Sequence, residues 1–140
     1  MTPQLFDDLK RDEGLRLTAY QDTLGVWTIG YGHAHVAPGM IWTQAQADIQ
    51  LHIDVARAAA DLDHVLAWWR TLDDVRQDVM AELAFNMGIG ALMTFHNTLG
   101  AVQHGDYAGA ADGMAASLWA RQVGARAGRL AAMMRTGARA

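Results

Sequence analysis

The chain has 140 residues, the usual length of one domain, and its composition of 51% apolar and 19% charged residues excludes a disordered protein. Cysteine is absent, which excludes disulfides and thiolate metal sites. The net charge of −4 is unevenly spread, because residues 113–140 carry five arginines and no acid, whereas residues 1–112 carry six basic and fifteen acidic side chains. We expect the arginines to pair with these acids, and we expect no nucleic-acid partner.

The N-terminal segment predicts a helix. Thr2 can cap it, Pro3 suits its first turn, and Gly14 can end it. Leu5, Phe6 and Leu9 form one apolar face of this helix. The segment has no basic stretch followed by an apolar core, so we expect no secretory signal.

A small antiparallel sheet is predicted next. Short aromatic and β-branched runs at residues 17–20 and 26–29 are followed by Tyr31, and glycines separate them. Residues 22–25 have the composition of a turn between the first two runs. The change from helical to strand periodicity predicts a sheet lobe over about residues 15–42.

Helices follow the sheet. Thr43 and Gln46 form a capping box, and Ile49, Ile53 and Ala56 continue an apolar face along the helix that it begins. Apolar residues spaced by three and four predict another long helix that ends at Gly88. Shorter helices are expected over residues 98–103, 107–119 and 125–134, with the eight methionines and most of the tryptophans in the core.

These elements predict an α+β fold in a single domain, residues 1–140. The N-terminal helix and a helical lobe from about residue 62 lie beside the small sheet lobe, with a cleft between the lobes. The longest span without a charged residue, 83–105, is interrupted by polar residues and glycines. We expect a buried helix and a turn there, and no stable membrane insertion.

Three residues carry the candidate chemistry. Glu13 lies at the end of the first helix, Asp22 on the hairpin turn, and Thr28 on the returning strand. Glycoside hydrolysis uses one carboxyl group that gives a proton and one that stays ionised. A carboxyl at a helix C-terminus faces the negative end of the helix dipole, which disfavours ionisation, so Glu13 is the candidate acid. Asp22 is the candidate base, and the Thr28 hydroxyl is placed to hold a water.

The string around these residues resembles the signature of the phage-type lysozymes, glycoside hydrolase family 24. That motif is Glu, eight residues, Asp or Cys, five residues, Thr, and Glu13, Asp22 and Thr28 match it in type and spacing. The resemblance covers nearly the whole chain, at residues 12–17, 20–23, 25–33, 85–88, 95–99, 119, 126–129 and 135–137.

The resemblance implies a lysozyme-like fold and an endolysin muramidase that causes host cell lysis. The substrate would be the β-1,4 bond between N-acetylmuramic acid and N-acetylglucosamine in bacterial peptidoglycan, cleaved with inversion. Ala34, Phe85 and Thr98 match family positions that line the sugar cleft. Ala34 falls where the family often has a larger apolar residue, and Gly113 replaces an asparagine that contacts sugar.

The family pattern also suggests supporting contacts. Arg126 is expected to approach Glu13, and Arg129 to approach Asp12. His33, after the glycine run, is expected to pair with an aspartate on the long helix. In this chain the aspartate is Asp54, and the pair would hold the wall of the cleft that carries Thr28.

His33 and His35 lie on alternate residues, a spacing that metal sites use, but no nearby group completes a ligand set. We therefore expect neither a metal nor a cofactor. Two other functions stay open: a catalytically silent wall-binding module, and a lytic transglycosylase that uses the sugar's own hydroxyl. The enzyme is expected to be a monomer made in the host cytoplasm, and a holin-like pore would give it access to the wall.

Overall fold

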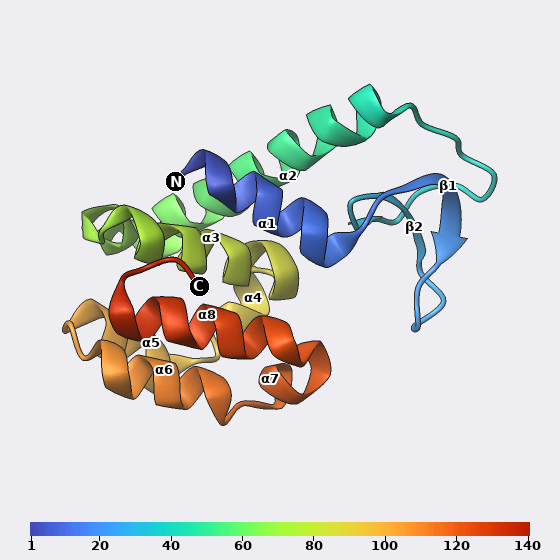
Figure 1. Ribbon diagram of the computed structural model, residues 1–140. Helices are drawn as coiled ribbons and strands as arrows, with labels where there is room; N and C mark the ends of the chain where they lie inside the picture. The colour runs from blue at the N-terminus through green and yellow to red at the C-terminus, as the bar shows by residue number, and fades with distance from the viewer. The chain divides into compact units, whose positions relative to one another are not determined.

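The computed structural model describes residues 1–140 (Figure 1). By their contacts these residues form two units. The sheet unit is Pro3–Arg57, and the helical unit is Met1–Thr2 together with Ala58–Ala140. As predicted, the protein combines helices with a small antiparallel sheet and belongs to the α+β class.

The sheet unit begins with helix α1, Pro3–Glu13. Its start at a proline and its end before Gly14 are as predicted. Of the predicted apolar face of α1, Leu5 and Leu9 are buried and Phe6 is half-buried. The strands of this unit are β1 (Arg16–Gln21), β2 (Trp27–Gly30) and β3 (His33–Ala34). Helix α2 spans Gln44–Val65, and its first part, up to Arg57, belongs to this unit.

The three strands form an antiparallel sheet in the order β1-β2-β3, which confirms the predicted sheet. Tyr20 pairs with Thr28 across the β1–β2 hairpin, and the register shifts between Arg16 and Tyr20. On the other edge of β2, Thr28 pairs with Ala34 of β3. Thr28 therefore lies on the central strand, with a partner on each side.

Helix α2 begins at the predicted capping box. The amide of Gln46 donates to the Thr43 hydroxyl at 3.2 Å, and the Thr43 amide donates to the Gln46 side chain at 2.8 Å. The predicted apolar face of this helix is wrong. Ile49 and Ile53 are 61% and 46% exposed, and Ala56 is exposed as well. The buried face lies on nearly the opposite side of the helix, at Ala47, Leu51, Val55, Ala58, Ala59 and Leu62.

The helical unit contains the second part of α2 and seven shorter elements. These are η1, a 3₁₀ helix, and α3 to α8, at Ala67–Thr71, Asp74–Met87, Ile89–Leu92, His96–Gln103, Tyr107–Ala115, Leu118–Val123 and Ala125–Thr136. The expected helix over residues 107–119 is in fact two helices, because the Ser117 side chain caps a new one by accepting from the Ala120 amide at 3.2 Å. Helix α8 packs against α6 (Figure 1).

Large apolar side chains fill the core of this unit. Met80, Met114, Met133 and Met134 are buried, and so are Trp69 and Trp119. The predicted core role holds for these four methionines and two tryptophans, whereas the remaining methionines and tryptophans are half-buried or, like Met1, exposed. No helix in the structure combines the length and apolarity required to cross a membrane.

An exposed carboxylate links the end of α2 to the 3₁₀ helix. Asp63 accepts hydrogen bonds from the Trp69 indole at 2.8 Å and from the Arg70 guanidinium at 2.8 Å and 3.1 Å. The Arg70 bonds, followed by the Trp69 bond, lower the pKa of Asp63 below its usual value. The contact fixes the turn that leads from α2 into the 3₁₀ helix.

Candidate active site

Glu13 is the last residue of α1 and is half-buried. The helix ends there because Gly14 adopts a φ of +69°, and its amide still donates to the carbonyl of Lys10 at 3.0 Å. The chain then turns into β1. The helix end thus presents the Glu13 carboxyl beside the sheet.

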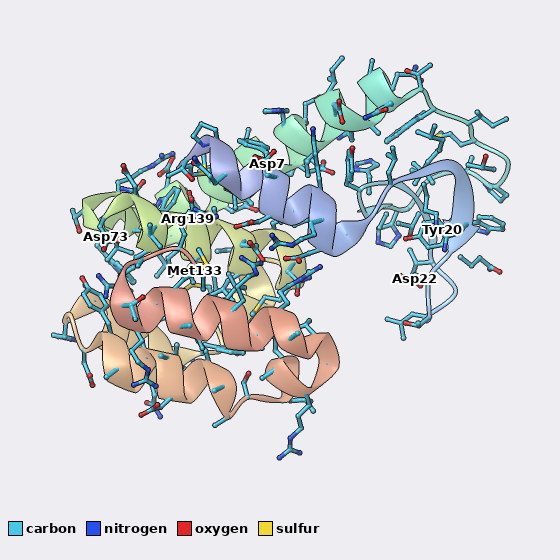
Figure 2. All side chains as sticks on the ribbon, in the orientation of Figure 1. Asp7, Tyr20, Asp22, Asp73, Met133 and Arg139 are labelled. Atoms are coloured by element: carbon cyan, nitrogen blue, oxygen red, sulfur yellow. The ribbon has the colours of Figure 1, made fainter.

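Asp22 begins the turn of the β1–β2 hairpin, just beyond Tyr20 (Figure 2). Its Oδ1 accepts from the amides of Leu24 at 2.8 Å and Val26 at 2.9 Å. The backbone pairs here as well, since the Asp22 amide donates to the Val26 carbonyl at 2.9 Å. The turn therefore fixes one carboxylate oxygen and leaves Oδ2 to accept from a water or a substrate.

Thr28 is related to Asp22 by the register of the hairpin. It lies opposite Tyr20, and Asp22 follows Tyr20 by two residues, which is the repeat of a strand. Thr28 is 4% exposed, and its hydroxyl donates to the Val26 carbonyl at 3.0 Å. Because the proton of this hydroxyl is used in that bond, its lone pairs are left to accept a hydrogen bond.

The Glu13 carboxyl lies against the turn that joins β2 to β3. A Cβ atom built on Gly32 would come within 2.8 Å of Glu13 Oε2. The sequence patterns did not reveal this contact. Within the sheet unit, the structure thus brings Glu13 to the end of the strand that carries Thr28.

A polar cluster connects this turn to the two helices of the sheet unit. The Tyr31 hydroxyl donates to Asp48 of α2 at 3.1 Å, and Lys10 of α1 forms an ion pair with Asp48 at 3.4 Å. Burial raises the pKa of the Tyr31 phenol, and the hydrogen bond and the negative charge of Asp48 act in the same direction. The cluster was not expected, because nothing in the local pattern relates these positions.

His33 and Asp54 meet as expected. Nδ1 of His33 is 2.8 Å from Oδ2 of Asp54, and the other oxygen of Asp54 accepts from the side chain of Gln50 at 2.9 Å. Ala34, next to His33, is half-buried on β3. In this structure no three His, Asp or Glu side chains are grouped closely enough to hold a metal ion.

The helical unit carries the other two expected substrate residues. Phe85 is half-buried on α3, and Thr98 is buried on α5. Thr98 lines an open hollow of about 250 Å³ with residues 94–97, and Phe85 is not part of its lining. A Cβ atom on Gly113 would overlap the Thr98 hydroxyl. The glycine that departs from the family pattern thus makes room for the threonine, a relation that the sequence alone did not show.

The C-terminal arginines bind acids, as their distribution predicted. Within the helical unit, Arg129 donates to Glu82 at 2.7 Å, and Arg135 forms an ion pair with Asp112. Glu82 is 1% exposed, and it was not expected as a partner of Arg129. The expected approaches of Arg126 to Glu13 and of Arg129 to Asp12 stay predictions, because each joins residues of different units.

Comparison with known proteins gives the family. Residues 10–136 match the family model described as phage lysozyme. An endolysin of Acyrthosiphon pisum secondary endosymbiont phage 1 is 41% identical over 73% of this chain and 68% of its own length. The probable T4-type lysozyme 1 of Dictyostelium discoideum is 26% identical over 98% of this chain and 96% of its own.

A third relative is much longer. The pre-baseplate central spike protein Gp5 of Enterobacteria phage T4 is 31% identical over 92% of this chain, which spans only 27% of that protein. The family match extends from the helix that carries Glu13 to the end of α8. The chain therefore belongs to the phage lysozyme family, and it is a glycoside hydrolase of the endolysin muramidase type.

Proposed function

We propose that the chain hydrolyses the β-1,4 bond between N-acetylmuramic acid and N-acetylglucosamine with inversion, and that Glu13, Asp22 and Thr28 carry the reaction. Glu13 gives its proton to the glycosidic oxygen as the bond from that oxygen to the sugar carbon breaks. A water attacks the same carbon from the opposite face, and Asp22 takes the proton that this water loses. The products are two saccharide ends, one of them a reducing end.

The hydrogen bonding of Asp22 and Thr28 is the observation that carries this proposal. Oδ1 of Asp22 is held by two amides, and the proton of the Thr28 hydroxyl is used by the Val26 carbonyl. Both side chains are left with acceptor sites, and strand alternation continued from Tyr20 to Asp22 puts them on the same side of the hairpin. A water that donates to both acceptors directs a lone pair outward, and this is the orientation that an attacking nucleophile needs.

Further residues are part of the proposal in supporting roles. Ala34, Phe85 and Thr98 contact the sugars. His33 with Asp54 supports the strand region that carries Thr28, a role favoured by their separation of 2.8 Å. We propose that Arg126 orients Glu13 and that both units, residues 1–140, act as one muramidase domain.

Digestion of purified peptidoglycan with mass analysis of the product ends tests the reaction. Reducing ends are expected. 1,6-Anhydro ends would instead identify a lytic transglycosylase, and no cleavage would identify a silent wall-binding module. Proton NMR during the first minutes of digestion reports the anomer released, and a product that retains its configuration would contradict inversion.

Assembly state and access to the wall form a separate part of the proposal. We expect the enzyme to act as a monomer, and sedimentation at working concentration measures that. We expect cytoplasmic synthesis and passage through a holin-like pore. Cells that express the chain should then lyse only when a holin is expressed with it, and lysis without a holin would contradict this route.

A further inference from the structure

The turn between β2 and β3 contains a glycine, Gly32. The space that a side chain on it would occupy is taken by the carboxyl group of Glu13. We propose that Gly32 is a positioning residue for Glu13, and this inference rests on the catalytic role proposed for Glu13. A Cβ atom on Gly32 would be 2.8 Å from Oε2 of Glu13 and 3.4 Å from its Cδ. Atoms do not approach that closely without repulsion, so a side chain at position 32 and the present position of the carboxyl exclude each other.

Backbone conformation is not the only reason for glycine in this turn. Gly32 has a φ of +77°, which strains any other residue. Three residues later, however, His35 adopts a φ of +63°. The same segment thus already contains one side chain with positive φ, and what distinguishes position 32 is the contact with Glu13.

Gly32 belongs to a segment, residues 30–33, whose other three residues each contact helix α2 or the loop before it. We call this segment the wall. Gly30 packs directly against the ring of Trp42, and Tyr31 donates to Asp48. His33, on the other side of Gly32, is bound to Asp54. Glu13 is a longer side chain, and rotation about its bonds lets the carboxyl shift. When a methyl group is added at position 32, the carboxyl should therefore move and the wall should stay.

Movement of the carboxyl affects catalysis more than stability. A general acid must lie within hydrogen-bond reach of the leaving oxygen, and a misplacement of about 1 Å is enough to cost about 100-fold in rate. Gly32→Ala should therefore lower kcat about 10- to 100-fold and change KM little, because it displaces the acid and removes no sugar contact. It should also alter the pH profile of kcat.

Gly39→Ala is the matched control. Gly39 has a φ of +80°, and a Cβ atom there meets nothing within 4 Å. This variant therefore carries the same backbone strain in the same unit without touching Glu13. A value of kcat for Gly32→Ala within about threefold of that for Gly39→Ala, with unchanged pH dependence, would overturn the inference.

A stability cycle tests the contact without using activity. Thermal unfolding is compared for wild type, Gly32→Ala, Glu13→Ala and the double variant. With the carboxyl removed, the added methyl group has room, so the loss of Tm caused by Gly32→Ala in the Glu13→Ala background should equal that of Gly39→Ala. If Gly32→Ala does not fold by itself, the double variant should fold. An undiminished loss, or a double variant that stays unfolded, would show that Glu13 is not what the methyl group meets.

Adding Glu13→Gln to this set of variants separates the two proposals. If Glu13→Gln keeps more than about a tenth of the activity, the proposed role of Glu13 fails, whatever Gly32→Ala does. If Glu13→Gln is inactive and Gly32→Ala behaves like Gly39→Ala, only the positioning role of Gly32 fails.

Discussion

The proposed base of the sheet unit and the buried acids of the helical unit are held by different kinds of partner. In the helical unit, Asp78 and Glu82 are each 1% exposed and are bound by the arginines Arg139 and Arg129. In the sheet unit, Asp22 is partly exposed, and backbone amides hold one of its oxygens. A guanidinium that neutralises a buried carboxylate fixes it in one state. A carboxylate held by amides keeps an oxygen that can exchange a proton, so the first arrangement suits structure and the second suits chemistry.

The largest effect that tests this comparison is expected when the proposed acid of the sheet unit, Glu13, is changed. Glu13→Gln keeps the shape of the side chain and cannot give a proton, so cleavage of peptidoglycan should fall by about 10²- to 10⁴-fold or more. Circular dichroism and the Tm should stay close to those of wild type. A variant that folds normally and keeps more than a tenth of the activity would contradict the assignment.

The next effect is on stability in the helical unit. Arg129→Met removes a guanidinium from the buried carboxylate of Glu82, and breaking a buried ion pair from one side typically costs about 3 kcal/mol or more. Arg135→Met is the control on the same helix, because the partners Arg135 and Asp112 are exposed and such pairs contribute under about 1 kcal/mol. Urea unfolding at pH 7 measures both variants. Equal losses would mean that burial does not distinguish the two pairs.

The smallest effect depends on pH and lies in the sheet unit. The folded pKa of Tyr31 is raised, so its stabilisation is fully present below the unfolded value of about 10 and is lost as the pH rises through the folded value. Tyr31→Phe should cost about 1 kcal/mol at pH 7, and the difference from wild type should narrow above pH 10.

Urea unfolding at the two pH values gives this comparison, and Tyr20→Phe, another tyrosine of the same unit, is its control. A difference between wild type and Tyr31→Phe that stays constant from pH 7 to pH 11 would mean that the hydroxyl does not titrate as part of the Asp48 cluster.

Local patterns in the sequence predicted the elements that short-range chemistry determines. The capping box at Thr43, the turn at Asp22 and the helix end at Gly14 each depend on residues within four positions of one another. The resemblance to the phage-type lysozymes added the expectation that His33 meets Asp54, which lies 21 residues further along the chain. The spacing of the catalytic candidates was visible for the same reason, since they lie on one helix end and one hairpin.

The features that were missed depend on which surfaces meet in three dimensions. Helix α2 offers more than one apolar stripe, and its sequence does not state that Leu51 and Val55 are covered while Ile49 and Ile53 face outward. The contact of Gly32 with Glu13 could not be seen either, because it depends on where a loop of the sheet passes the end of a helix.

The double hydrogen bond to Asp22 also makes the hairpin a reporter of that carboxylate. Leu24 is 86% exposed, yet its amide proton is bound to Oδ1, as is that of Val26. Amide exchange with deuterated solvent should therefore be slower at these two positions than exposure of the turn suggests, and it should accelerate when Asp22 takes up a proton, since a neutral carboxyl is a weaker acceptor. Two backbone signals in an NMR spectrum thus follow the charge of the proposed base with no probe attached to it.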